Sequence, residues 1–263
     1  MIDLHSHVVP AVDDGAASMT EAIKMLRMAE SDGIETIVAT PHVFSSHDLE
    51  KDPELIFRKV EIFLKEVGQS NLKIRVLPGA EVFFTTNLLQ YFKEYQCLLT
   101  LNASDYFLLE FPFDFIFPGI KEFIYRVLME GWIPIIAHAE RNQLIQRKPE
   151  ILYEMVKLGV LAQINAGSLK GDFGEVVQAT AFQLLHYNLV HVIASDAHSP
   201  KFRVPRLSFV PDLLRDAGVE EPELLIQEIP RAIIDNRGIP DIGSPRNPRR
   251  TIKFFDFIKG KFR

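Results

Sequence analysis

The sequence has almost no cysteine: Cys97 is the single one among 263 residues. An intramolecular disulfide and a zinc site built on thiolates are therefore both excluded. Long apolar runs are absent too, since the best stretch near a predicted strand is Ile133–Ala137 and a membrane-spanning helix needs about 20 residues. No basic segment precedes an apolar one at the N-terminus, so we predict no signal peptide and expect a cytoplasmic protein.

Several catalytic motifs are also missing. A cysteine phosphatase needs an arginine six residues after its cysteine, so that one loop cradles the phosphate, and Ala103 stands at that place. The sequence has neither a Gly-x-Ser-x-Gly elbow nor a glycine-rich phosphate loop with its lysine. Covalent catalysis therefore has no visible nucleophile, and hydrolysis by a metal-activated water remains.

The composition is ordinary for a globular protein, with 47% hydrophobic and 24% charged residues. The length allows one large domain, and α/β barrels often have this size. The formal net charge of −6 argues against a general nucleic-acid binder, so we expect no nucleic-acid partner.

Short apolar runs alternate with amphipathic stretches along most of the chain. Because several of the runs are apolar throughout, they are typical of strands buried on both faces in a parallel sheet. The pattern predicts an α/β fold, a distorted seven-stranded (β/α)7 barrel related to the eight-stranded form, with a doubly wound open sheet as the alternative. The expected strands are Ile2–Ser6, Glu35–Thr40, Lys73–Leu77, Tyr106–Phe111, Ile133–His138, Leu161–Asn165 and Val190–Ser195. The expected helices are Met19–Asp32, Pro53–Val67, Asn87–Tyr95, Ile120–Glu130, Pro149–Leu158 and Val176–Tyr187.

Histidines and carboxylates gather where the predicted strands end. His5 and His7 close the first strand, and side chains two apart on a strand point to the same side, so both imidazoles can face one ion. In a parallel barrel such ends form one rim, which carries the active site. The further candidate ligands are Asp14, His42, Glu81, Glu110, His138, Asp196 and His198.

These ligands offer nitrogen and oxygen only, which suits Mn, Fe or Zn. Nine candidates exceed what one ion needs, so we expect two or three divalent ions sharing a carboxylate. The other three histidines, His47, His186 and His191, are expected to be surface or core residues.

Two arginines are expected near the same rim. Arg141 follows His138 and Arg203 follows His198, and a planar guanidinium matches phosphate oxygens. A surface salt bridge is the alternative for each. Asn165, at the end of the sixth strand, could also face the pocket. The aromatic segment Phe111–Pro118 either walls the pocket or packs into the core.

The motifs Met1–His7, Asp13-Asp14-Gly15, Thr40-Pro41-His42, Gly79-Ala80-Glu81, His138–Arg141 and Val192–His198 together resemble the polymerase-and-histidinol-phosphatase (PHP) superfamily. Within it, the chain resembles most the bacterial tyrosine-protein phosphatases of capsule and exopolysaccharide synthesis. The resemblance covers about residues 1–240 and implies a distorted seven-stranded barrel with three metals, usually manganese. The resemblance also implies the usual substrate of these phosphatases, which is phosphotyrosine on a membrane-associated tyrosine kinase that controls polysaccharide chain length.

The resemblance also implies roles for single residues. It assigns His5, His7, Glu81 and Asp196 to one ion, and a second ion to Glu81, Glu110 and His138. Asp14, His42 and His198 would hold the third, and Arg141 and Arg203 would bind phosphate. Ala16 departs from the family, which often has proline there.

Two other functions remain open. The same site could hydrolyse a small phosphate ester such as histidinol phosphate. A regulatory module with a degenerate metal site would lack some ligands, whereas all nine positions are filled here.

The C-terminal segment differs from the rest of the chain. We therefore divide the chain into a phosphatase domain of residues 1–244 and a tail of residues 245–263. The tail carries seven basic residues, one acid and four phenylalanines. Ile252–Ile258 could form a short amphipathic helix that contacts an anionic membrane or another subunit. Packing against the chain itself, or disorder, is the alternative.

Overall fold

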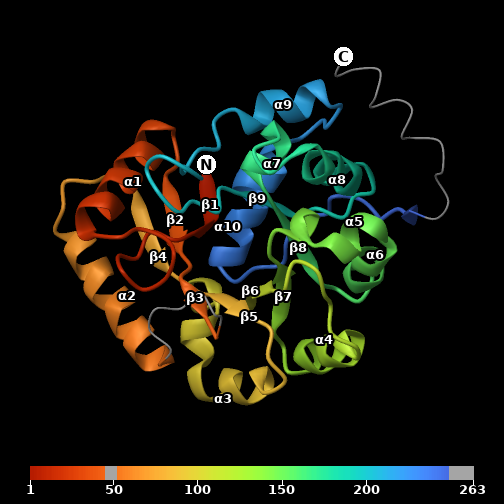
Figure 1. Ribbon diagram of the computed structural model, residues 1–263, viewed down its shortest axis with the longest axis horizontal. Helices are drawn as coiled ribbons and strands as arrows, with labels where there is room; N and C mark the ends of the chain where they lie inside the picture. Colours follow the sequence, from red (N-terminus) through yellow and green to blue (C-terminus); the bar gives the residue numbers. More distant parts are fainter. Residues whose placement is uncertain (45–51, 249–263) are drawn as a thin grey trace.

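The computed structural model describes residues 1–44 and 52–248, except for the side chain of Gln96. Helices surround a central set of parallel strands (Figure 1). The strands are β1 (Ile2–Ser6), β2 (Thr36–Ala39), β3 (His42–Val43), β4 (Arg75–Pro78), β5 (Glu81–Phe83), β6 (Tyr106–Glu110), β7 (Ile133–Ile136), β8 (Leu161–Asn165) and β9 (Val192–Ala194). The predicted tail helix at Ile252–Ile258 and the prediction for His47 lie outside the described residues.

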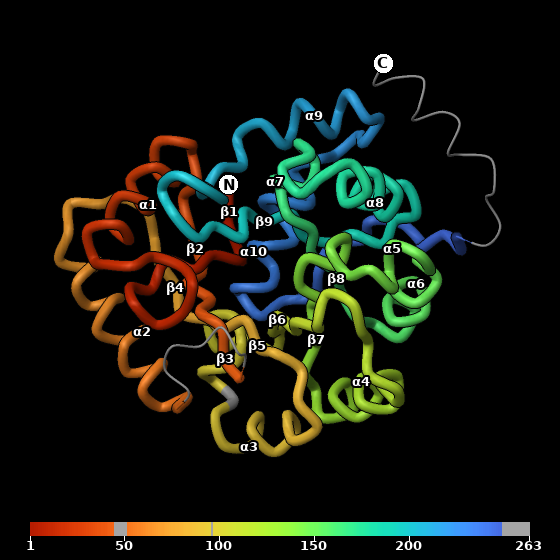
Figure 2. The backbone as a smooth tube through the Cα atoms, viewed as in Figure 1, coloured from red at the N-terminus to blue at the C-terminus, as the bar shows by residue number. Residues whose placement is uncertain are grey.

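The strands form a three-stranded sheet in the order β1-β2-β4 and a six-stranded sheet in the order β3-β5-β6-β7-β8-β9. A parallel bridge between Ser6 and Ala197 brings the segment after β9 back to β1. Figure 2 shows β1 beside β9, although the two lie far apart in the sequence. A doubly wound open sheet would not return in this way, so the prediction of a curled, barrel-like parallel α/β fold is confirmed.

The predicted count of seven strands is not confirmed, because the described residues form nine strands in two sheets. The chain bends between β2 and β3 at Pro41, which has no amide hydrogen to donate to a ladder. It bends again between β4 and β5 at Gly79, where a Cβ atom would lie 2.7 Å from Val38 Cγ1. Each bend follows the end of a predicted strand, and a further short strand that was not predicted, β3 or β5, begins after it.

The helices connect the strands and cover their outer side. Side-chain oxygens of Ser18 and Asp52 accept backbone amides at the starts of α1 and α2, and Gly33 after α1 has a φ of 87°. The helices are α1 (Met19–Ser31), α2 (Pro53–Gly68), α3 (Leu88–Leu99), α4 (Ile120–Met129), α5 (Gln143–Arg147), α6 (Glu150–Val156), α7 (Ala166–Lys170), α8 (Glu175–His186), α9 (Val210–Asp216) and α10 (Ile229–Ile234). Three short helical turns complete the set, at η1 (Leu101–Ala103), η2 (Ala139–Arg141) and η3 (Leu224–Glu228).

The core lies between the strands and these helices. Every residue of β1, β6 and β8 is buried, as expected for strands covered on both faces. None of the helices in the described ranges is long and apolar enough to cross a membrane.

Candidate metal centre

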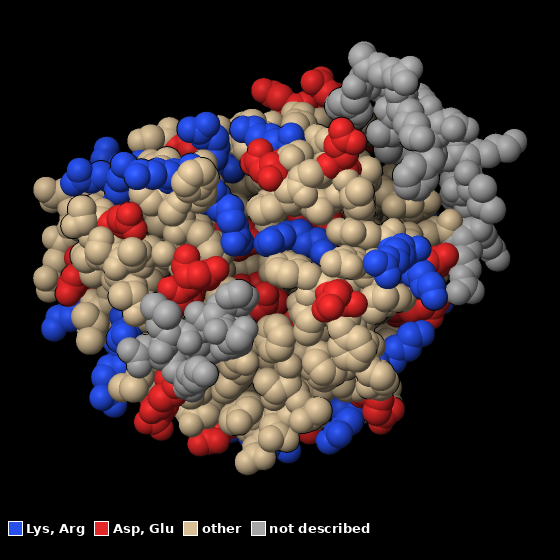
Figure 3. Space-filling model, viewed as in Figure 1, with Lys and Arg blue, Asp and Glu red and all other residues tan. Residues whose placement is uncertain are grey.

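All nine predicted ligands lie in one connected cluster at the carboxyl ends of the strands. His5 is the penultimate residue of β1 and Glu110 is the last residue of β6. His42 and Glu81 follow the carboxyl ends of β2 and β4, where they open the short strands β3 and β5. The remaining ligands, His7, Asp14, His138, Asp196 and His198, lie in the connections that follow β1, β7 and β9. Asp14 is partly exposed and the other eight side chains are buried. In the face shown in Figure 3, basic and acidic side chains meet around a central hollow.

The first group within the cluster combines His5, His7, Glu81 and Asp196. The Nε2 atoms of His5 and His7 each lie 3.2 Å from Glu81 Oε2 and 3.5 Å from Asp196 Oδ1. The two Nε2 atoms are themselves 3.2 Å apart. Four ligand atoms therefore converge on one point, as the resemblance predicts for one ion.

The second group has Glu81 and Glu110 at its centre. His42 Nδ1 lies 3.1 Å from Glu81 Oε2 and 3.3 Å from Glu110 Oε2. His138 Nε2 lies 2.9 Å from Glu81 Oε1 and 3.8 Å from Glu110 Oε1. His42 thus joins the two glutamates more compactly than His138 does, and His42, Glu81 and Glu110 form a group that could hold an ion. The resemblance assigns His138 rather than His42 to this group.

The third group surrounds Asp14. Its Oδ1 atom lies 3.3 Å from His198 Nε2 and 3.5 Å from His42 Nε2. A ligand atom of His7 falls within the same group. Because His7, His42 and Glu81 each belong to more than one group, ions bound there would be close neighbours.

The carboxylates of the cluster fit divalent cations. Glu81 Oε2, Glu110 Oε2 and Asp196 Oδ1 are buried and accept no hydrogen bond from any residue that the structure describes. Burying a charged oxygen without a partner is unfavourable, and a cation coordinated by oxygen and imidazole nitrogen would remove that penalty. The residues could therefore hold two or three such ions.

The charges of the cluster shift its pKa values in opposite directions. Burial disfavours charge on His42, but the Glu81 carboxylate outweighs it and raises the pKa of His42 to about 10. Burial would raise the pKa of Glu81, yet neighbouring imidazoles, His5 foremost, hold it well below its usual value. Protons and metal ions therefore compete for the same nitrogens, and metal binding would release protons.

Neighbouring side chains orient the ligands. His7 Nδ1 lies 2.8 Å from Asp13 Oδ2, which also accepts the His42 backbone amide at 3.0 Å. Gln163 Oε1 lies 3.2 Å from His5 Nδ1 and accepts the His138 amide. Partners of this kind fix which ring nitrogen faces a metal.

Gly15 packs directly against His7, which is possible because glycine has no side chain. A Cβ atom there would lie 2.2 Å from the His7 carbonyl oxygen and 2.5 Å from its Cβ. The glycine of the Asp13-Asp14-Gly15 motif is thus required by close packing of the loop on the ligand.

Both predicted arginines reach the cluster through Asp196. Arg203 forms a short ion pair with Asp196 Oδ2, and Arg141 Nη1 lies 3.5 Å from the same oxygen. Asn165 donates to this oxygen at 2.6 Å, so it faces the site as the sequence allowed. His138, Asp196 and Arg203 adopt positive φ angles of 32°, 51° and 52°, and strained backbone of this kind gathers at functional sites.

Comparison with known proteins identifies the family. The family model described as capsular polysaccharide synthesis, CpsB/CapC, matches residues 1–235. The chain belongs to the CpsB/CapC family. It is 35% identical to the tyrosine-protein phosphatase YwqE of Bacillus subtilis over 98% of this chain and 100% of that protein. It is also 37% identical to the putative tyrosine-protein phosphatase CapC of Staphylococcus aureus, over 76% of this chain and 77% of that one.

A solved structure similar to this CpsB/CapC member supports the same assignment. It comes from a crystallographic study of YwqE from Bacillus subtilis and CpsB from Streptococcus pneumoniae, which describes both as metal-dependent tyrosine phosphatases. The TM-score is 0.86 at 35% identity, with 94% of this chain and 99% of that chain covered.

Two aromatic residues of this CpsB/CapC chain form a part of the site that the sequence only partly predicts. The Cζ atom of Arg141 lies 4.5 Å from the ring centroids of both Phe113 and Phe173, so two rings enclose its guanidinium group. Phe113 belongs to the predicted aromatic segment Phe111–Pro118. One residue of this segment, Phe113, lies at the site, and another, Phe111, is buried in the core. Phe173 lies in a loop and has no motif around it that could have revealed it.

Other supporting residues were missed for a similar reason. Gln163 is a polar residue between two apolar residues of strand β8. This polar position was the only feature of the sequence that could have indicated its contacts with His5 and His138. Glu140 is buried, accepts hydrogen bonds from Ser168 and the Asn165 amide, and stands next to Arg141. His191 is a core residue whose Nδ1 atom accepts the Ala162 amide, which agrees with the prediction.

Proposed function

We propose that the chain is a metal-dependent protein-tyrosine phosphatase, a phosphoric monoester hydrolase. The observation that carries this proposal is Asp196, because one of its oxygens faces His5 and His7 while the other contacts Arg141 and Arg203. A phosphate held by the two arginines would thus lie beside the metal ligands.

The proposed metal ligands are His5, His7, Asp14, His42, Glu81, Glu110, His138, Asp196 and His198. We expect these ligands to hold divalent ions, with manganese as the expected metal. Such ions, when bound, lower the pKa of a water and neutralise charge on phosphoryl oxygens. Arg141 and Arg203 bind the remaining phosphoryl oxygens and offset the charge that develops during transfer. The water gives up a proton to solvent as its oxygen forms a bond to phosphorus, and the bond from phosphorus to the tyrosine oxygen breaks. The tyrosinate then takes a proton from solvent, and inorganic phosphate is the other product.

The site also suits a phenyl leaving group. A tyrosine hydroxyl has a pKa near 10, low for an alcohol, so its departure demands less of a general acid. The Phe113 side chain is 37% exposed and its ring centroid lies 5.5 Å from that of His138, where it can contact the ring of phosphotyrosine. The naming of YwqE and CapC as tyrosine-protein phosphatases points to the same substrate class.

The biological setting forms part of the proposal. We assign catalysis to residues 1–244, as one distorted barrel of the PHP type acting in the cytoplasm. The substrate would be a phosphotyrosine-bearing protein, namely a membrane-associated tyrosine kinase of capsular or exopolysaccharide synthesis. The family description, capsular polysaccharide synthesis, supports this setting.

The test is steady-state hydrolysis of a phosphotyrosine peptide and of histidinol phosphate, with Mn²⁺ and after chelation. We expect peptide turnover that requires metal, a lower kcat/KM for histidinol phosphate, and loss of turnover in His138→Ala. His186→Ala, which changes a histidine outside the cluster, is the matched control. Equal turnover in wild type and His138→Ala would refute the proposed site, and a clear preference for histidinol phosphate would refute the proposed substrate.

A further inference from the structure

A second cavity lies away from the metal cluster, between α8, α9 and η3. Its volume is about 1240 Å³, larger than the 300–1,000 Å³ usual for small-molecule sites. None of the nine proposed ligands, Arg141 or Arg203 lines it. The dimensions therefore suit a peptide segment, and the cavity is separate from the metal centre.

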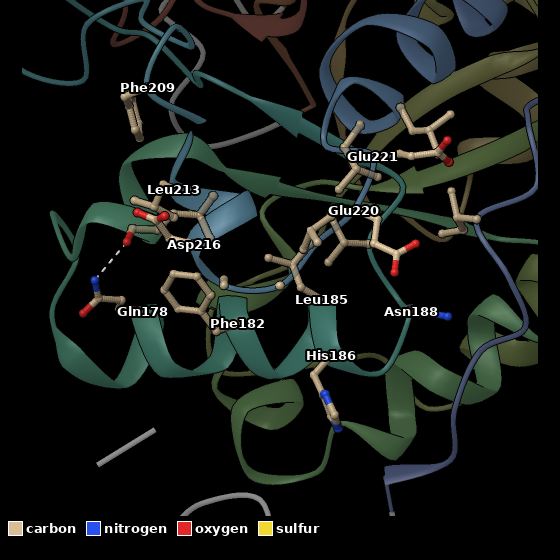
Figure 4. Close-up of a pocket in the computed structure, with 18 of the residues that line it drawn as sticks. Gln178, Phe182, Leu185, His186, Asn188, Phe209, Leu213, Asp216, Glu220 and Glu221 are labelled. Atoms are coloured by element: carbon tan, nitrogen blue, oxygen red, sulfur yellow. Dashed lines mark hydrogen bonds between the residues drawn. The ribbon is translucent and has the colours of Figure 1, made fainter. Parts of the chain in front are cut away.

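The floor of this groove is apolar. Phe182 and Leu185 project into it from α8, and Leu213 projects from α9 (Figure 4). Leu224 and Ile242 add to the same lining, and all five side chains are only partly buried against the core. A contiguous apolar surface of this kind commonly marks an interaction site.

One edge of the groove is acidic. Asp216, Glu220 and Glu221 line it, as labelled in Figure 4, and are exposed. Their carboxylates form no ion pair with any residue in the ranges 1–44 and 52–248. Two bases also line the groove, but Arg246 donates to the His186 carbonyl oxygen and Lys170 lies 3.9 Å from the centroid of the Phe209 ring. The acidic edge thus offers charge for a basic, apolar partner.

The last residues that the structure describes, up to Pro248, lie beside this groove. Arg246 lines it, and its amide donates to the Tyr187 carbonyl oxygen at 2.8 Å, so the backbone is fixed only two residues before Pro248. The sequence then continues for 15 residues, 249–263, which could span about 50 Å if extended. Those residues include six bases, one acid, four phenylalanines and two isoleucines.

We propose that residues 249–263 dock in the groove of their own chain. Their aromatic side chains fill the apolar floor, and their lysines and arginines face Asp216, Glu220 and Glu221. Because Arg246 already fixes the start of the segment at the groove, docking is intramolecular and has a high effective concentration. A second copy of the chain would have to compete with this.

Hydrogen–deuterium exchange on the full chain tests the proposal directly. Replacing the tail aromatics, in Phe254→Ser/Phe255→Ser/Phe257→Ser, should speed exchange in α8 and α9 by about tenfold or more and leave β1 and β6 unchanged. The matched control is Ile62→Ser/Met129→Ser, which removes exposed apolar side chains from other helices and should leave α8 and α9 as in wild type. Identical exchange in wild type and the tail variant would overturn the proposal.

Charge reversal tests the acidic edge without disturbing the core. Glu220→Lys/Glu221→Lys should reproduce the faster exchange of the tail variant, whereas Glu61→Lys/Glu66→Lys on α2 should not. Equal effects of the two pairs would contradict a specific contact between the tail and the acidic edge.

Cross-linking separates docking within a chain from exchange between copies. In a Cys97→Ser background, Glu221→Cys with Phe257→Cys should oxidise to a disulfide within one chain. A second sample mixes two variants, one with only Glu221→Cys and the other with only Phe257→Cys. If this mixture forms mainly covalent dimers, the groove accepts a second copy and the proposal fails. It also fails if the tail variant loses binding to phosphatidylglycerol vesicles while exchange at α8 and α9 is unaffected, because the tail would then serve a membrane.

Discussion

The ligand-bearing side of the site takes four of its nine proposed ligands from strands, whereas both residues of its arginine-bearing side lie in connections. His5 lies one residue before the end of β1, Glu110 ends β6 and Glu81 opens β5, so backbone ladders hold these three in place. Arg141 lies in a short turn after β7 and Arg203 in the loop after β9. Side chains must hold these two, namely the rings of Phe113 and Phe173 and the carboxylate of Asp196.

This difference suggests a division of function that mutation can test. The ligand-bearing side should determine how many metal ions bind. The arginine-bearing side should determine how well phosphate is held, without affecting the ions. The following variants test this separation, starting with the largest expected effect.

Glu81→Gln should have the largest effect, because Glu81 is shared by two ligand groups. The change keeps the shape of the side chain but removes the charge that neighbouring histidines and metals need. We expect loss of at least one ion per chain and a fall in kcat/KM of about 10³-fold or more, or roughly 4 kcal/mol of transition-state stabilisation. Elemental analysis and peptide turnover measure both, with Glu122→Gln as control. Full metal content with full activity would show that Glu81 is no ligand.

Arg141→Ala should lower kcat/KM by about 10²- to 10³-fold while leaving the metal content unchanged. The guanidinium would no longer offset charge on the phosphoryl group, but no ligand is removed. Arg206→Ala is the matched control, because Arg206 lies in the same part of the chain as Arg203 yet pairs with Asp32. Loss of metal in Arg141→Ala would erase the distinction between the two sides of the site.

Asp13→Asn should weaken metal binding by about 10- to 100-fold, as changes to groups that orient ligands commonly do. Asparagine cannot provide both the charge beside His7 Nδ1 and the acceptor for the His42 amide. Competition with a chelating dye measures the affinity, and the exposed Asp114→Asn serves as control. Unchanged affinity would mean that the backbone alone orients His7.

Phe173→Leu should have the smallest effect, a fall in kcat/KM of about 3- to 10-fold, since one cation–π contact contributes about 0.5–2 kcal/mol. Metal content should stay the same. Phe202→Leu, at a phenylalanine that is 80% exposed, is the matched control. If both variants keep wild-type kinetics, Phe113 alone is enough to hold Arg141.

The same division explains what the sequence could predict. The positions of proposed ligands such as His5 and His7 were predictable, because strand periodicity and the end of an apolar run fix where these side chains point. The bounds of β1 and β8 were predicted to the residue for similar reasons. Phe173 was not predictable, because its approach to Arg141 depends on a loop path that no local pattern encodes. The predicted count of seven strands was not confirmed, because the short strands β3 and β5 follow Pro41 and Gly79 and are too short to show an apolar run of their own.

The position of Asp196 has a consequence for each catalytic cycle. Between turnovers this carboxylate is an internal counter-anion for Arg203 and Arg141. If the two arginines bind phosphate as proposed, an arriving phosphate would exchange with an anion that the protein already contains. The same exchange in reverse would assist departure of the inorganic phosphate, because the arginines would regain a partner as the product leaves. We therefore expect the site to limit inhibition by its own product.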